Sequence, residues 1–370
     1  MNFHRSAGHA LAVVAIVGCR SAQSQAALTH DARLPVNFGM LSNVVELANG
    51  QVVFTDTKSK LFLRGDLNSG KVDTLGTRLD SVGRSSPAGQ YKFPGWVAHL
   101  AGDTIALVDF SALRTTLWNE SGKPLDVLPV QDVGGNTPIL VYDTVGKGYK
   151  IDYQAVVGGG EPGRALRPDS IPVLRIPLRG GGATDTVARL TSPEYGDATF
   201  GEEVQQAAKV FAPNDFFGVL PDGTAWVARA REGRIDWRSP KGEWLLGQPH
   251  EFARVPVTEA DKARVLAQVR EQGKQFGMPQ DLRIVYPFAE TKPAFDFALG
   301  RPTGEVWVQQ PRKTETAALV YSIFDRKGRW QRDVPFPKDA SLAGFGAKGV
   351  VYASIRNGDG SRSLARFSLK

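Results

Sequence analysis

Cysteine is almost absent from this chain of 370 residues, since Cys19 is the only one. A single cysteine excludes a disulfide within the folded part, so buried side chains must stabilise the fold. Histidine is also scarce, and after residue 26 only His30, His99 and His250 remain. None of the three stands at a spacing typical of zinc ligands, and we expect surface or packing roles for them.

The start of the chain has no apolar run long enough to span a bilayer. Ala10 to Gly18 is a run of nine largely apolar residues after Arg5, typical of the apolar core of a secretory signal. It ends Ile-Val-Gly-Cys, which is typical of a bacterial lipoprotein processing site. We predict that residues 1–26 are a lipoprotein signal with a short tether and that lipidation of Cys19 is the sole membrane attachment. Cleavage of an ordinary signal after Ala26 is the alternative, which gives a soluble periplasmic or secreted protein.

Clusters of positive charge are also lacking. The net charge is +7 and the isoelectric point is near 9.4, yet no run of Lys and Arg exceeds two residues. Nucleic-acid binding needs clustered charge, so we expect no nucleic-acid partner. The composition predicts a solvated basic surface with a mild attraction to anionic envelope polymers.

Turn residues and short apolar segments are abundant, with 40 glycines and 23 prolines. Three segments share a glycine-containing turn, an apolar strand, a polar residue and a second strand, and two looser copies follow. The five begin at Asn49, Ala101, Pro221, Thr303 and Ala347. Repeats of this kind, with a sixth unit between 129 and 200, predict an all-β fold. We expect residues 27–370 to form a six-bladed β-propeller of four-stranded antiparallel blades.

Two further structural expectations follow from the sequence. A helical insertion is predicted at about 257–278, with Thr258 as N-cap, Asp261 at the third helical position, and Gly277 and Pro279 at its end. It covers a face or fills a gap between blades, with a lid or partner-binding helix as the alternative. Because an open ring would expose strand edges, we also expect the segment near 32–39 to supply the outer strand of the last blade.

Four stretches of the sequence carry a resemblance to a known family. They are "VGRSSPAGQYKFPGWVAHLAGDTIALVDF", "FFGVLPDGTAWVARAREGRIDWRSPKGEW", "VPVTEADKARV" and "KPAFDFALGRPTGEVWVQQ". In this order they resemble a family of exported bacterial six-bladed β-propeller proteins of the NHL/TolB-like kind, from about Val82 to Gln310. The resemblance implies the fold but no established activity. The chain has Ser85 to Gln90 where the family has a glycine-rich loop, so no site is carried over from that loop.

Polar residues at equivalent places in the repeats are the candidates for ligand binding. We predict that Asp56, Asp109, Arg229 and Gln310 face the central funnel. This set is mixed, unlike the ring of oxygen ligands that calcium requires. We therefore predict no cofactor, while a divalent metal in the funnel stays open as an alternative.

No catalytic residue is predicted from the sequence. A G-x-S-x-G motif is lacking, and the carboxylates of Glu202 and Glu203 form a pair only in sequence. Arg114 and Arg234 follow the polar residue of their repeats and are expected to stack on an aromatic ring or to tie blades together. We expect the tryptophans to pack between blades, with a carbohydrate platform as the alternative. They are Trp96, Trp226, Trp237, Trp244 and Trp307.

A glycine motif in the middle of the chain has a structural interpretation. Gly158, Gly160 and Gly163 formally match G-x-G-x-x-G, the dinucleotide fingerprint. That fingerprint requires a helix after the glycines, but Pro168 and Pro172 follow instead. We interpret the stretch as a long loop on the rim of the propeller.

Two classes of function are consistent with these observations. We favour a non-enzymatic binding or scaffold propeller of the bacterial cell envelope. It would be a monomeric lipoprotein, on the periplasmic side or at the outer membrane, that holds a protein, peptide or glycan. The alternative is a hydrolase or lyase, of a lactonase, esterase or NHL-lyase type, with its site in the central funnel.

Overall fold

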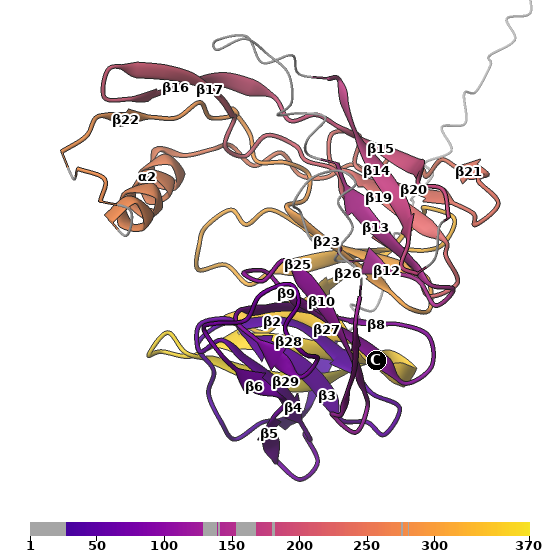
Figure 1. Cartoon of the computed structure of the whole chain (residues 1–370). Coiled ribbons are helices and arrows are strands. Elements are labelled where there is room, and N and C mark those ends of the chain that lie inside the picture. Colours follow the sequence, from indigo (N-terminus) through magenta and orange to yellow (C-terminus); the bar gives the residue numbers. More distant parts are fainter. Residues whose placement is uncertain are drawn as a thin grey trace, which may run out of the picture.

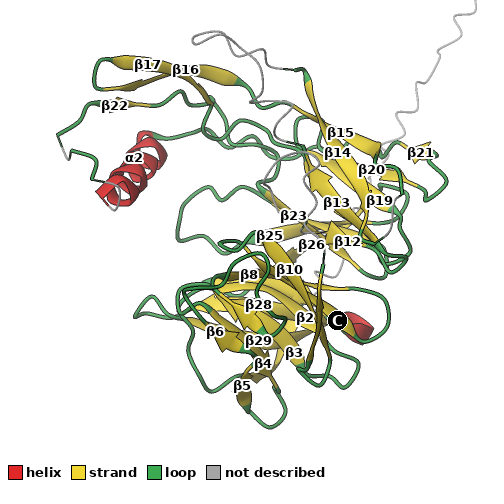
Figure 2. Cartoon of the chain, viewed as in Figure 1, coloured by secondary structure: helices red, strands yellow, loops and turns green. Residues whose placement is uncertain are grey.

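The computed structural model describes residues 27–128, 139, 141–152, 168–179, 182–274, 277–279 and 281–370. β-Strands dominate these residues, as Figure 2 shows, and they contain one α-helix, α2 (Glu259–Lys274), and a short 3-10 turn, η1 (Ala347–Gly349). Six of the sheets in the described part have four antiparallel strands each, which matches the six blades expected. Cys19 and the motif at 158–163 lie outside the described residues.

Five of the six blades are built from four strands that follow one another along the chain (Figure 1). The first blade contains β2 (Leu41–Glu46), β3 (Val52–Asp56), β4 (Leu61–Gly65) and β5 (Val72–Thr74). The second contains β8 (Pro94–His99), β9 (Thr104–Asp109), β10 (Arg114–Asn119) and β11 (Pro124–Val127). The third contains β12 (Val141–Tyr142), β13 (Lys147–Ile151), β14 (Ser170–Pro177) and β15 (Asp185–Thr191).

The remaining blades follow the same plan. The fourth contains β18 (Phe216–Val219), β19 (Ala225–Arg229), β20 (Arg234–Arg238) and β21 (Trp244–Leu245), and the fifth contains β23 (Phe297–Arg301), β24 (Glu305–Gln309), β25 (Val320–Phe324) and β26 (Trp330–Pro335). The sixth contains β27 (Ala340–Phe345), β28 (Val350–Arg356), β29 (Arg362–Leu369) and, as its outer strand, β1 (Leu28–Arg33) from the other end of the chain.

The pairing of β1 with β29 joins the two ends of the described chain. It is antiparallel and places Leu28 opposite Leu369 and Arg33 opposite Ala365. The expectation that an N-terminal segment supplies this strand is confirmed, although the strand lies at 28–33 and not at 32–39. Leu34, directly after it, is 1% exposed and packs between the sixth and first blades.

The core consists of six clusters of buried side chains, each of which joins two consecutive blades. One cluster joins the sixth blade to the first, so the ring is closed. Trp226, Trp237 and Trp307 are at most 3% exposed in these clusters, which confirms packing between blades for them, whereas Trp244 is 42% exposed. Burial of one large apolar side chain stabilises the fold by roughly 1.5–3 kcal/mol, so each cluster contributes strongly.

Two insertions form an arm that projects from the blades at the upper left of Figure 1. The hairpin of β16 (Tyr195–Phe200) and β17 (Glu203–Ala208) lies between the third and fourth blades, and α2 with β22 (Ile284–Val285) lies between the fourth and fifth. β22 pairs with β16, which joins the two insertions. A smaller parallel pair, β6 (Thr77–Arg78) and β7 (Gln90–Tyr91), lies between the first two blades.

Helix α2 begins where the sequence predicts, because its cap satisfies free backbone donors. Thr258 Oγ1 accepts a hydrogen bond from the Asp261 backbone N–H at 3.2 Å, and Asp261 Oδ2 accepts one from the Thr258 N–H at 3.1 Å. Val265, Leu266 and Val269 are half-buried. Among the described residues, no helix has the length and apolarity needed to cross a membrane.

Removal of β1 should destabilise the whole ring. A chain that begins at Leu34 lacks the partner of β29 and exposes the edge of the sixth blade. We expect its thermal unfolding midpoint to fall by about 3–6 °C, which corresponds to a loss of roughly 2–4 kcal/mol in a domain of this size. The comparison is with a chain that begins at Ala27, and equal midpoints in circular dichroism would contradict ring closure by β1.

Candidate functional site

The four predicted ligand residues lie where the second strand of a blade turns toward the third. We call this side of the ring the turn face. It comprises the connections that lead into the first strand of each blade and the turns between the second and third strands, at 57–60, 110–113, 230–233 and 310–319. Asp56, Asp109 and Arg229 end β3, β9 and β19, and Gln310 directly follows β24. No contact in the described part of the chain joins any two of the four.

Asp56 uses its carboxylate to hold the backbone. It is 3% exposed. Its oxygens accept hydrogen bonds from the backbone N–H groups of Gly39 and Met40 at 2.9 Å each, Lys58 at 3.2 Å and Ser59 at 3.4 Å. Burial raises the pKa of Asp56, but these bonds outweigh it and leave the pKa below its ordinary value. The carboxylate therefore ties the turn after β3 to the segment that enters β2.

Asp109 repeats this arrangement in the second blade. It is 1% exposed and accepts N–H bonds from Lys92 at 2.6 Å and Phe93 at 3.1 Å, before β8, and from Ser111 at 3.0 Å and Ala112 at 2.9 Å, in the turn. Both aspartates have a structural role, because their oxygens are occupied by buried amides. Ligand binding by either stays a prediction, and it would require these bonds to break.

Arg114 ties the second blade to the connection that precedes it. The side chain is 3% exposed and donates to the backbone carbonyls of Ser86, Pro87 (3.1 Å) and Gln90 (2.5 Å), in the connection between these blades. Burial lowers the pKa of Arg114, and the charge of Asp109 raises it in part. Arg114 thus forms hydrogen bonds to the segment between two blades, while a direct tie between the blades stays a prediction. Arg234 instead pairs with Asp236 of its own strand at 2.9 Å.

Arg229 ties the end of the second strand to the segment before the first strand, as Asp56 and Asp109 do, but here the strand end carries the cation and the segment carries the carboxylate. Its guanidinium pairs with Asp215 at 2.7 Å, directly before β18, and with Asp236 at 3.3 Å. It also donates to the Arg189 carbonyl at 2.8 Å, in the outer strand of the third blade. The side chain of Arg229 is 17% exposed and that of Asp215 is 2% exposed. The cation therefore stabilises the blade, and funnel binding by it stays a prediction.

Gln310 is held inside the fifth blade. Its amide donates to Ser322 Oγ at 2.9 Å, and Ser322 donates to Asp333 at 2.7 Å. The preceding Gln309 donates to Asp296 at 2.7 Å, whose pKa burial raises above its ordinary value. The amide of Gln310 is thus part of the hydrogen-bond network of the blade. Ligand binding by Gln310 stays a prediction.

The histidines have packing or surface roles, as expected. His250 stacks on Trp330 with ring centroids 4.9 Å apart, and burial lowers its pKa. His30 packs edge-on against Phe367, and His99 is exposed. In the described residues no group of three or more His, Cys, Asp or Glu side chains is placed to hold a metal ion.

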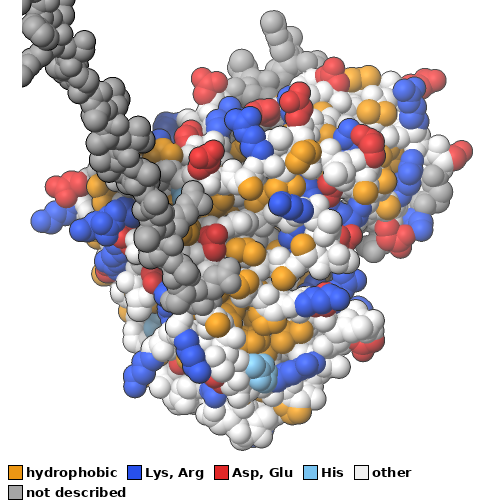
Figure 3. All heavy atoms as spheres, turned by 180° about the vertical axis from the view of Figure 1, so that it is seen from behind, with side chains coloured by type: hydrophobic (Ala, Val, Ile, Leu, Met, Phe, Trp, Pro, Cys, Tyr) orange, Lys and Arg blue, Asp and Glu red, His pale blue; other side chains and the backbone are white. Residues whose placement is uncertain are grey.

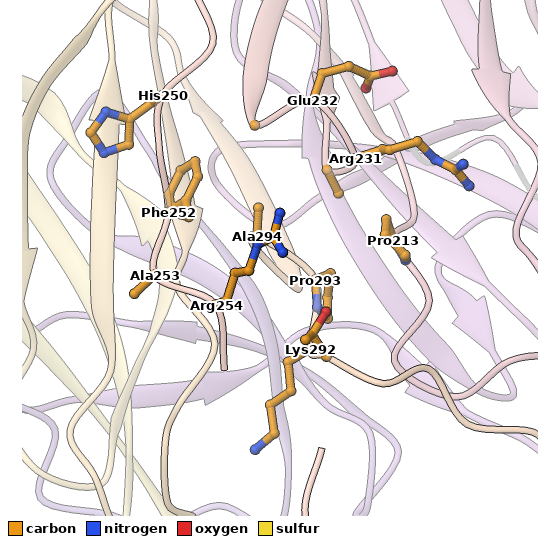
Figure 4. Close-up of a pocket in the computed structure, with 13 residues that line it drawn as sticks. Pro213, Arg231, Glu232, His250, Phe252, Ala253, Arg254, Lys292, Pro293 and Ala294 are labelled. Carbon is orange, nitrogen blue, oxygen red and sulfur yellow. The ribbon is translucent and has the colours of Figure 1, made fainter. Parts of the chain in front are cut away.

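A pocket of about 220 Å³ opens on the turn face at the fourth blade (Figure 4). Three segments form it: the turn at 230–233, the connection at 250–254 and the stretch at 291–294 that enters β23. Its lining includes three cationic residues, Arg231, Arg254 and Lys292, and one acidic residue, Glu232. The sequence reasoning missed this pocket, because only the turn at 230–233 belongs to a repeat, while the segments at 250–254 and 291–294 lie outside the repeats on either side of the α2 insertion.

The three cations of this pocket differ in how they are paired. Arg231 pairs with Glu194 at 3.1 Å. Lys292 pairs with Asp261 of α2 at 2.9 Å, and the two side chains are 9% and 11% exposed. Arg254 is exposed and has no ion pair or hydrogen bond to any residue that the structure describes. Figure 4 shows its side chain reaching toward Ala294 in the middle of the pocket, so this guanidinium is available to an anion.

The face shown in Figure 3 is mixed in charge. Lys and Arg side chains are scattered over it, with Asp and Glu side chains between them. This distribution agrees with the scattered basic surface that the sequence predicts. The long-range attraction of this face for an anion is therefore modest, and the affinity for an anion depends on the individual cations that it contacts.

Comparisons with known proteins agree on the fold alone. No family model and no curated protein matches the chain. A solved structure from Bacteroides fragilis, described as a candidate exported protein, has 11% identity and a TM-score of 0.50, covering 94% of this chain and 96% of its own. A DUF4221 family member from Bacteroides vulgatus has 9% identity and a TM-score of 0.46, covering 94% and 99%. A gluconolactonase from Xanthomonas campestris has 14% identity and a TM-score of 0.41, covering 94% and 95%.

The four-stranded sheets and the closed ring define a β-propeller. This is the fold that the resemblance implies. At such identities, the neighbours support no inference about activity.

The role of Asp109 can be tested by Asp109→Asn. The substitution replaces one carboxylate oxygen, which accepts a backbone N–H, with an NH₂ group. This group and the backbone N–H are both donors, so the hydrogen bond is lost. We expect a loss of about 1–3 kcal/mol in the free energy of unfolding, measured by urea denaturation. Asp103→Asn, in an exposed turn of the same blade, is the control and should change little. Equal effects of the two substitutions would contradict the structural role.

The attachment of α2 can be tested through Lys292. Its ammonium group bonds Asp261 and the Arg312 carbonyl, so Lys292→Met removes the less exposed of the two cations that pair with Asp261 and leaves Arg264. We expect amide hydrogen exchange in α2 to rise by about tenfold, which corresponds to about 1.4 kcal/mol, because the carboxylate keeps one cationic partner. Lys274→Met, which removes an exposed pair within the same helix, should leave the exchange nearly unchanged.

Acid should weaken this attachment in the unmodified protein. Burial raises the pKa of Asp261, but bonds from Lys292, Thr258 and Arg264 lower it well below its ordinary value of 3.8. A lowered folded-state pKa contributes stability above the unfolded pKa, and this contribution is lost as the pH falls toward the folded value. Opening of α2 should therefore increase below about pH 4. A pH-independent opening rate would contradict this account of the pair.

Proposed function

We propose that the protein is a non-enzymatic binding propeller of the bacterial cell envelope, which holds an anionic group of a protein, peptide or glycan in the pocket at the fourth blade. The observation that carries this proposal is Arg254, a cation with no ion pair among the described residues, beside Arg231 and Lys292 in a cavity of about 220 Å³. A guanidinium binds a carboxylate or phosphate through two parallel hydrogen bonds. The cavity has room for such a group with part of the molecule that carries it.

The polar positions of the blades support binding over catalysis. Asp56, Asp109 and Asp215 are buried and bonded to backbone amides or to Arg229. A general base or metal ligand needs a free lone pair directed at the reacting group. The alternative, a hydrolase or lyase with its site in the funnel, would have to draw its groups from elsewhere.

The location in the envelope is part of the proposal. It is supported by the short apolar run at Ala10 to Gly18 and the processing-type sequence that ends at Cys19. In this view the lipidated Cys19 holds a monomeric propeller at the periplasmic side or at the outer membrane, and the pocket recognises an envelope component.

Thermal-shift titration with sodium glucuronate, and with glucose as the uncharged comparison, tests the pocket. At ten times the dissociation constant, glucuronate should stabilise the protein by about 1.4 kcal/mol, while glucose should not. Arg254→Ala should remove this shift. Arg270→Ala, an exposed arginine on α2 outside the pocket lining, should retain it.

The same titration separates the two classes of function. A rise of several degrees with calcium or zinc ions, and none with glucuronate, would favour a metal-dependent enzyme. A glucuronate shift that survives Arg254→Ala would contradict the assignment of the pocket.

A further inference from the structure

The turn face of the first and second blades carries a pair of aromatic rings, of which Phe110 is exposed and Phe93 is half-buried. The rings of Phe93 and Phe110 are stacked, with their centroids 6.2 Å apart and an angle of 29° between their planes. Phe110 is 37% exposed to solvent. The Phe110 N–H donates to the Phe93 carbonyl at 3.0 Å. A Cβ at Gly95 would come within 2.1 Å of the Phe110 ring, so glycine is needed for the ring to lie there. The rings form a preformed apolar platform.

Three lysines surround this platform. Lys60 places its Nζ 5.9 Å from the centroid of the Phe93 ring, Lys58 lies exposed in the same turn, and Lys92 precedes Phe93. The backbone of Lys60 is left-handed, with φ of 58°, in the turn that Asp56 holds. None of the three lysines forms an ion pair within the described residues.

The two aspartates that end the neighbouring strands form no ion pair with these lysines within the described residues. Asp56 and Asp109 lie beneath this surface, and both are buried and accept backbone N–H bonds. The surface thus combines flat aromatic rings with free ammonium groups, and the charge complement of this combination is an anion.

We propose that this surface, formed by Phe93, Phe110, Lys58, Lys60 and Lys92, binds a polymer of acidic sugars. The C–H faces of sugar rings pack on aromatic rings, and the carboxylates along the chain pair with ammonium groups at several places. The choice of a glycan over a nucleic acid rests on the envelope location in the proposed function. The surface itself is separate from the pocket at Arg254, because it lies on the first two blades.

The experiment uses the full chain and an oligogalacturonate of about ten sugars, with a maltodextrin of equal length as the neutral comparison. Binding is measured by isothermal titration calorimetry at low and high salt. The oligogalacturonate should bind, with weakening at high salt, and the maltodextrin should bind much more weakly. Lys58→Glu with Lys92→Glu should weaken binding by about tenfold or more, because two attractions become repulsions. Phe110→Ala should weaken it by about threefold or more, through loss of stacking.

The matched control lies on the opposite side of the same two blades. Lys71 and Lys123 follow the turns between the third and fourth strands of the first and second blades, at the other end of the strands. Lys71→Glu with Lys123→Glu changes the net charge equally and should leave affinity within about twofold. Unfolding midpoints of all variants confirm that each is folded.

Three outcomes would overturn the proposal. Equal weakening by both lysine pairs would indicate non-specific attraction to net charge. Equal binding of maltodextrin would exclude a role for the carboxylates. Tighter binding of a single-stranded oligonucleotide than of the oligogalacturonate would assign the platform to nucleic-acid bases. The lysine and Phe110 substitutions are also compared in an Arg254→Ala chain, in which the pocket lacks this cation, so failure of the platform is distinct from failure of the pocket.

Discussion

Closure of the ring by β1 and β29 is the constraint on which the other features of this fold depend. Each blade buries its two faces only against its neighbours, as the six clusters between consecutive blades show. An unclosed sixth blade would leave the edge of β29 unpaired and weaken the cluster that contains Leu34. Closure therefore makes the stability of the propeller cooperative, and it fixes the turns whose geometry positions both candidate surfaces.

On the turn face, different residues tie the end of the second strand to the segment before the first strand. In the first two blades an aspartate at the end of the second strand binds amides before the first strand. In the fourth blade the carboxylate is Asp215, before the first strand, and Arg229 is its partner. The linkage is preserved while the charge at the repeating position changes sign. Polar groups at these positions are thus largely committed to the fold, and recognition is left to the connections and insertions.

The sequence predicted what depends on local pattern and failed where contacts join distant segments. Strand periodicity, the Thr258 cap and the packing of Trp226 and Trp307 follow from neighbouring residues, and the structure confirms them. The bonds of Asp109 depend on strand register, which the alignment of repeats does not contain. The pocket brings together segments around positions 231, 254 and 292, and the platform joins a turn of one blade to the next blade's entry, so neither forms a sequence motif.

The order of the blades separates the two cationic surfaces. In a closed ring of six blades, the border of the first and second blades lies opposite the border of the fourth and fifth, where the pocket opens. A small anion therefore reaches only one surface at a time, and each should titrate independently. A long acidic chain that crosses the turn face can contact both, and its second contact is then intramolecular. The arrangement favours polymers over single sugars without requiring strong affinity at either surface.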